Sequence, residues 1–133
     1  MKKKISVLFA GLFALMLFAF VPKATDQKPW PVPDAAKNKA NPLKADVASV
    51  ATGKTLYNQH CKSCHGTKGK GDGTKAAQLD TECGDFTNAT FKAQTDGALF
   101  YKTSEGRKDM PSFKKKIPDA NDIWAVVNYM RTL

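Results

Sequence analysis

Residues 60–66 read His-Cys-Lys-Ser-Cys-His-Gly, and no other stretch constrains the chain as strongly. Cys61 and Cys64 lie three positions apart, and His65 follows directly. Two thiols at this spacing can bond to the two vinyl groups on one edge of a porphyrin, and the adjacent imidazole can then reach an iron beneath the macrocycle. Because Cys-x-x-Cys also occurs at zinc and redox sites, the choice between these chemistries depends on the rest of the chain.

The first 24 residues have the pattern of a secretory leader, in which lysines at positions 2–4 precede an apolar run from Ile5 to Val21. This run is long for a cleaved signal peptide and short for a membrane-spanning helix. Cleavage after Ala24 would place Pro22 at the −3 position, which fits poorly. Two alternatives therefore stay open, a signal peptide or an uncleaved anchor that associates with the membrane through residues 5–21. Both export the C-terminal part, so we expect a location in the periplasm or at the outer face of the cytoplasmic membrane.

The charge of the chain excludes one class of partner. The formal net charge is +9, but four lysines lie in or beside the leader, and without them 17 basic and 12 acidic residues leave about +5. There is no Arg-rich run and no basic stripe interleaved with aromatic residues. We therefore expect no nucleic-acid partner.

Residues 25–45 form a Pro-rich linker or arm. Five prolines fall between positions 22 and 42, three of them in the run Lys-Pro-Trp-Pro-Val-Pro at 28–33. Prolines at alternate positions favour extended polyproline geometry and remove amide donors, so the pattern predicts neither a helix nor a central strand. Two interpretations stay open: a tether that spaces the domain from the membrane, or a docking arm whose Trp30 lies on the domain or on a partner.

Residues 46–133 should form a single all-α domain that begins with a helix over residues 46–60. Val50, Gly53, Tyr57 and Cys61 share one face of this helix. Since glycine destabilises a helix relative to alanine, Gly53 predicts the close approach of another helix.

Two further helices are expected. Thr95 or Asp96 caps a short one that ends at Gly106, and Asp119 caps the last one. The last helix has an apolar stripe made of Ile123, Val126, Val127, Met130 and Leu133. No strand signal is comparably strong. Fewer than 90 residues bury only a modest core, and a covalent haem would supply much of the missing apolar volume.

The iron ligands follow from the positions of two histidines and two methionines. His65 is the proximal ligand by adjacency to Cys64, whereas His60 ends the first helix and is expected at the surface. Met130 belongs to the apolar stripe, where a methionine usually serves packing. Met110 lies in a loop, and the following Pro111 bars a helix there. A loop methionine preset by proline can hold a thioether against a metal, so Met110 is the predicted second ligand.

Cys83 is the cysteine left over if two bind haem. We expect a small, partly buried loop residue. An intermolecular disulfide or a reactive thiol is the alternative for Cys83, although the neighbouring acidic residues Glu82 and Asp85 would not lower its pKa. For the motif as a whole, a structural zinc site made of Cys61, Cys64, His65 and Cys83 is a further alternative, but adjacent Cys64 and His65 cannot easily both face one tetrahedral ion.

From about residue 53 to residue 133 the chain resembles a class I monohaem cytochrome c of bacterial type. The matching blocks are Cys61-Lys-Ser-Cys64-His65-Gly66, Gly69-Lys-Gly71-Asp72-Gly73, Met110-Pro111-Ser-Phe113 and Ile123-Trp124-Ala-Val-Val-Asn-Tyr129-Met-Arg131. The resemblance implies three main helices around one haem, with His65 and Met110 as axial ligands. It also implies that Gly53 and Tyr57 cross the last helix near Tyr129. Cys83 and the Pro-rich stretch over 22–42 depart from the family pattern.

The expected function is one-electron transfer in a respiratory or related electron-transport chain outside the cytoplasmic membrane. Ligation by histidine and methionine fills both axial positions, which suits an electron carrier rather than an enzyme. A membrane-anchored haem c subunit fixed in a larger oxidoreductase is the alternative. We expect no small-molecule substrate. The expected partners are redox proteins with an acidic docking surface, which would face Lys62 and Lys114–Lys116 around the haem edge.

Overall fold

The computed structural model describes residues 29–133, so the predicted leader lies outside the described residues. Its elements in chain order are α1 (Asp34–Lys37), α2 (Val47–His60), α3 (Lys62–His65), the 3₁₀ helix η1 (Ala76–Gln78), α4 (Ala89–Lys92), α5 (Asp96–Glu105) and α6 (Ala120–Met130). Within residues 29–133 there is no β-strand, only an isolated antiparallel bridge between Arg107 and Met110. The all-α prediction is confirmed.

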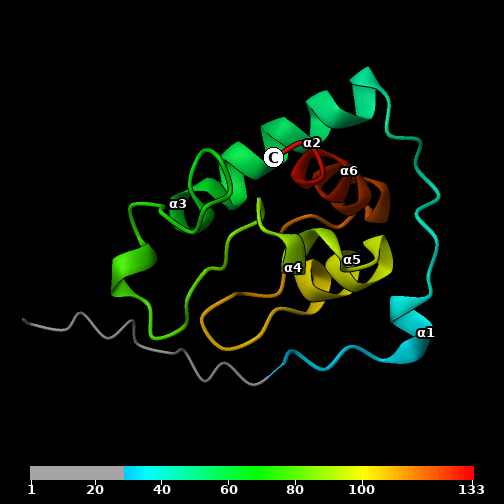
Figure 1. The fold of residues 1–133 in the computed structure, drawn as a ribbon. Coiled ribbons are helices and arrows are strands. Elements are labelled where there is room, and N and C mark those ends of the chain that lie inside the picture. The colour runs from blue at the N-terminus through cyan, green and yellow to red at the C-terminus, as the bar shows by residue number, and fades with distance from the viewer. Residues whose placement is uncertain (1–28) are drawn as a thin grey trace, which may run out of the picture.

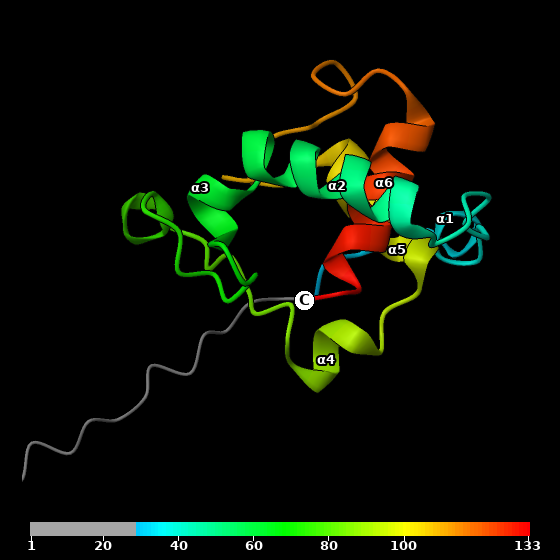
Figure 2. The same cartoon turned by 90° about the horizontal axis from the view of Figure 1, so that it is seen from above.

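The crossing of α2 and α6 forms the centre of the fold (Figures 1 and 2). Tyr57 of α2 is completely buried, and its ring lies 5.2 Å from that of Tyr129 in α6. Gly53, one turn earlier, lies against the backbone of Ala125. The predicted contact of the first helix with the last is therefore confirmed.

The three longest described helices begin within a residue or two of their predicted starts, and a side chain caps each of them. The Asp46 side chain accepts a hydrogen bond from the Ser49 amide at 2.9 Å, and the Thr95 hydroxyl accepts one from the Ala98 amide at 3.2 Å. Asp119 accepts one from the Asn121 amide at 2.8 Å. Each cap satisfies an amide that has no partner within its helix.

Helix α6 is buried on all sides, not along a single stripe. Every residue from Ile123 to Met130 is buried, and Met130 is 5% exposed, in the packing role predicted for it. Trp124 stacks on Phe100 of α5, with ring centroids 4.1 Å apart. Arg131, which follows the last residue of α6, donates to the Asp96 carboxylate of α5 at 2.8 Å. Helix α6 therefore lies between α2 and α5.

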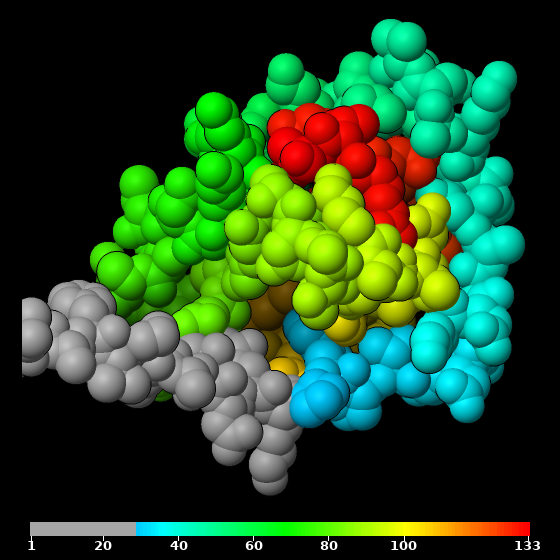
Figure 3. All heavy atoms as spheres, viewed as in Figure 1, coloured from blue at the N-terminus to red at the C-terminus, as the bar shows by residue number. Residues whose placement is uncertain are grey.

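The described part of the Pro-rich arm lies on the domain (Figures 1 and 3). Asn41 donates to the Asn128 side chain at 2.8 Å, and the Thr95 hydroxyl donates to the Lys37 carbonyl at 2.6 Å. A Cβ atom on Gly97 would lie 2.3 Å from the Ala36 carbonyl oxygen, so the arm touches the α5 backbone. Between the two interpretations of the arm, these contacts favour docking on the domain over a detached tether.

Short helices in two segments correct the sequence-based expectation. Helix α1 forms inside the arm, where no helix was predicted, because the run of prolines ends at Pro33 and that residue takes the N-cap position. Helix α4 includes Phe91 and lies between the first two predicted helices, where no helix was predicted. Asn88 caps α4 by accepting from the Phe91 amide at 2.8 Å. Each helix has only four residues, too few for a periodic sequence pattern.

Candidate haem site

One helical turn presents Cys61, Cys64 and His65 together. Cys61 follows the last residue of α2 and precedes α3, and its carbonyl accepts from the Cys64 amide at 3.1 Å and from the His65 amide at 3.0 Å. Residues three and four positions apart lie on one face of a helix. The turn therefore directs two thiols and an imidazole to the same side of the backbone.

The two thiols of this turn differ in burial. All three cysteines of the chain are free, and Cys61 is 8% exposed whereas Cys64 is half-buried. Burial raises the pKa of Cys61 to about 12, so its thiol is neutral at physiological pH. Within residues 29–133 no group of three or more His, Cys, Asp or Glu side chains could hold a metal ion. The four residues of the zinc alternative therefore do not form such a cluster.

The His65 imidazole has the properties of a metal ligand. Its Nδ1 atom is buried without a hydrogen-bond partner in the described structure. Burial lowers the pKa of His65 and favours the neutral ring, the form that binds metals. A buried polar atom without a partner is rare in native proteins. The ring packs 4.6 Å from that of Phe86, which belongs to the hydrophobic core. A neutral ring at the edge of an apolar core, beside two thiols, fits a covalently attached haem.

Met110 approaches the same core from a separate loop. The Arg107 amide donates to the Met110 carbonyl at 2.8 Å, and the Met110 amide donates back at 3.0 Å, which closes a tight turn. Lys108 inside this turn has a φ of 53°. Just before it, a Cβ atom on Gly106 would lie 2.4 Å from the Pro111 carbonyl carbon. Met110 itself is half-buried against the core cluster that contains Cys61 and Phe86. The two predicted axial ligands therefore border one apolar cluster.

His60 differs from its prediction as a surface residue. It is half-buried, and its ring lies 6.1 Å from that of Phe113 in an edge-on arrangement. Phe113 follows Met110 in the chain and is buried. His60 therefore packs the end of α2 against the segment that carries Met110.

Several supporting contacts were not predicted from the sequence. The Tyr57 hydroxyl donates to the Gly66 carbonyl at 2.7 Å and so fixes the end of the Cys-x-x-Cys-His turn. A Cβ atom on Gly73 would lie 2.4 Å from the Ser63 carbonyl oxygen, so the glycine-rich loop returns onto α3. Tyr57 and Gly66 were each identified in the sequence, but nothing in the sequence indicated the bond between them.

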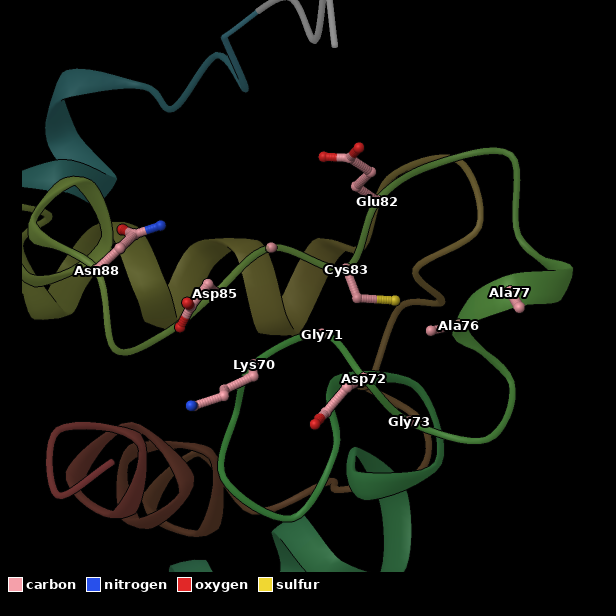
Figure 4. Close-up of a pocket in the computed structure, with 11 residues that line it drawn as sticks. Lys70, Gly71, Asp72, Gly73, Ala76, Ala77, Glu82, Cys83, Asp85 and Asn88 are labelled. Atoms are coloured by element: carbon pink, nitrogen blue, oxygen red, sulfur yellow. The ribbon is translucent and has the colours of Figure 1, made fainter. Parts of the chain in front are cut away.

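Cys83 belongs to a different segment of the chain and lines an open hollow of about 680 Å³ (Figure 4). The hollow separates residues 70–73 from residues 82–85, and the sulfur of Cys83 points into it. Burial raises the pKa of Cys83, and the nearby Cys64 and Asp109 act in the same direction. Cys83 is a half-buried loop residue, as predicted.

A helical fold in which one turn carries Cys-x-x-Cys-His at the edge of an apolar core defines a c-type cytochrome. Residues 48–130 match the family described as cytochrome c oxidase, cbb3-type, subunit III, and the chain belongs to this family. It therefore carries covalently bound haem c with iron, and its function is haem-based electron transfer.

Two solved structures resemble the fold. The first is the Kuenenia stuttgartiensis reducing HAO-like protein complex Kustc0457/Kustc0458, with a TM-score of 0.63 and 26% sequence identity over 79% of this chain and 50% of that one. The chain thus spans about half the length of this relative. The second is the KustC0563 c-type cytochrome, with a TM-score of 0.53 and 30% identity over 60% of this chain and 94% of that one. No curated protein matches the sequence.

Proposed function

We propose that the protein is a one-electron carrier in a respiratory or related chain outside the cytoplasmic membrane. In this proposal Cys61 and Cys64 would hold the haem by thioether bonds, and His65 and Met110 would be the two protein ligands of its iron. The haem supplies an iron couple that cycles between Fe(III) and Fe(II). The observation that carries the proposal is the buried His65 Nδ1 without a partner, on the turn that also presents both thiols.

The protein residues around the ligands have distinct roles in this proposal. The Tyr57 bond to Gly66 fixes the turn that bears His65. Phe86 and Phe91, stacked at 4.5 Å, exclude water beside the imidazole. The closed turn at Arg107 and Met110 presets the thioether, which reduces the reorganisation that accompanies electron transfer. With His65 and Met110 both on the iron, the metal would have no position left for a small-molecule substrate.

Redox proteins with an acidic surface are the proposed partners. Lys62 precedes Cys64 on the exposed side of α3, and Lys115 and Lys116 follow the Met110 segment in exposed positions. Lys114, in contrast, lies 2.5 Å from the Glu105 carboxylate. That pair leaves Lys62, Lys115 and Lys116 as the main contributors of positive charge to docking.

A second candidate role is that of a haem subunit fixed in a larger oxidoreductase. The similarity to a protein that is part of a complex favours it. Residues 5–21 would anchor such a subunit, and they lie outside the described residues. Within residues 29–133 no helix is long and apolar enough to cross a membrane. Extraction of native membranes separates the two roles, because a free carrier washes off without detergent.

The ligands are tested by carbon monoxide binding to the reduced, haem-loaded full chain. We expect no binding to the wild type, because Met110 fills the sixth position. Met110→Ala should bind carbon monoxide, whereas the control Met130→Leu should not, because Met130 packs inside α6. Ready binding by the wild type would exclude Met110 as a ligand.

A further inference from the structure

Trp30, in the Pro-rich arm, lies close to two cationic side chains. The Arg107 guanidinium carbon is 4.9 Å from the centroid of the Trp30 ring, and the Lys102 ammonium is 5.6 Å from it. Arg107 also donates to the Pro29 carbonyl at 3.3 Å. Burial lowers the pKa of Lys102, as does the neighbouring charge of Arg107. The electron-rich face of the indole ring therefore stabilises two cations that repel each other.

Arg107 connects this contact to Met110. Its backbone makes both hydrogen bonds that close the turn carrying the methionine. A second contact supports the turn from the other side, where the Asp109 carboxylate accepts from the Thr81 amide at 2.8 Å. Two separate segments of the chain thus brace the Met110 turn, and one of them is the arm.

The arm lies outside residues 48–130, the part that matches the family. The resemblance to a cytochrome c therefore does not account for Trp30, and a tether would not need a tryptophan that lies on a domain. Further along the arm, Asn41 is fixed to Asn128 of α6. Residues 34–37 of the same arm form α1, which packs on α5 (Figure 1).

We propose that Trp30 is a positioning residue for Met110: the ring holds Arg107, and Arg107 holds the turn that presents the thioether. This inference rests on the proposed ligation by Met110. Without the Trp30 ring, the hydrogen bonds between Arg107 and Met110 should break more often. The Met110 thioether would then dissociate from the iron more often. An external ligand that competes with Met110 reports this opening, because its apparent affinity scales with the open fraction.

The test measures the binding of free imidazole to the oxidised, haem-loaded full chain. Trp30→Ala should raise the apparent imidazole affinity about fivefold, because a cation–π contact of about 1 kcal/mol corresponds to that factor at 1.4 kcal/mol per tenfold. Trp30→Phe keeps an aromatic face and should recover most of the wild-type affinity. Arg107→Gln should raise the affinity at least as much as Trp30→Ala, because it also removes the bond to the Pro29 carbonyl. The effect of the double variant should be smaller than the sum of the two single effects, because both changes remove the contact between Trp30 and Arg107.

Two controls distinguish a specific effect of Trp30 on Met110 from a general destabilisation of the arm. Asn41→Ala weakens the arm at α6, away from the Met110 turn, and should leave imidazole affinity unchanged. Met110→Ala should bind imidazole most tightly and should lose the ferric absorption band that arises from sulfur coordination. If Met110→Ala changes neither the imidazole affinity nor the absorption band, Met110 is not a ligand and the proposed role of Trp30 is wrong as well. If Met110→Ala behaves as expected but Trp30→Ala binds imidazole like the wild type, only the positioning role is overturned.

Discussion

A Cβ atom at Gly53 would lie 1.9 Å from the carbonyl oxygen of Ala125, so α2 and α6 meet backbone to backbone (Figure 2). The same added Cβ atom would lie 3.0 Å from the Cβ atom of Tyr129. No side chain can be accommodated at position 53 unless the two helices separate.

Gly53→Leu should therefore lower the free energy of unfolding by ~3 kcal/mol or more, since overpacking a well-packed core typically costs 1–3 kcal/mol. Gly53→Ala should lower the free energy of unfolding by less, because alanine stabilises a helix by up to ~1 kcal/mol relative to glycine. Denaturant unfolding of the haem-loaded protein measures both. Thr52→Ala, at the exposed neighbouring position, is the control and should stay near the wild type. An unchanged midpoint for Gly53→Leu would contradict the crossing.

Tyr57→Phe should lower stability by ~1–3 kcal/mol, because the Gly66 carbonyl would lose its buried hydroxyl partner. Tyr101→Phe is a matched control, since Tyr101 is half-buried in α5. Thermal or denaturant unfolding compares the two. Equal stability of both variants would mean that the bond to Gly66 contributes nothing net.

Covalent haem attachment should depend on two of the three cysteines. Cys61→Ser or Cys64→Ser should leave the haem on one thioether, or on none if maturation fails. Cys83→Ser should retain full attachment, because Cys83 lies in a different segment (Figure 4). The mass of the denatured protein gives the amount of attached haem. Reduced attachment in Cys83→Ser would show that the wrong pair had been assigned.

Reduction by a physiological redox partner should slow as salt rises, because exposed charges are screened beyond ~10 Å at 0.1 M. Lys115→Glu should slow it at low salt. Lys44→Glu changes the charge equally but lies in the arm, and should have little effect. Lys114→Ala should slow the reduction less than Lys115→Ala does, because Lys114 already forms an ion pair with Glu105. A rate indifferent to salt would favour the fixed-subunit role.

Local signals in the sequence predicted the helix starts and the contact between the first and last helices. Thr95 and Asp119 act on amides two or three residues away, so their capping roles are visible without tertiary structure. Gly53 was informative because a glycine inside a helix is costly and needs a reason. The Cys-x-x-Cys-His spacing likewise defines a single turn.

Contacts between distant segments were not predictable in the same way. Asn41 and Asn128 are 87 positions apart, and nothing near either residue indicates the other. The partner of Arg131 is Asp96 of α5, which only the packed helices reveal. Trp30 was recognised as a docking residue among the alternatives, but its partners Lys102 and Arg107 follow from the path of the arm.

The reduction potential of the haem-loaded full chain tests the central claim most directly. A potentiometric titration followed by absorbance should show a single one-electron transition, with ~59 mV per tenfold change in the ratio of oxidised to reduced protein. Met110→Ala should lower the midpoint, because a thioether ligand favours reduced iron, while Met130→Leu should leave it in place. A midpoint that does not move in Met110→Ala, or a transition that is not a one-electron step, would contradict the account of a carrier ligated by His65 and Met110.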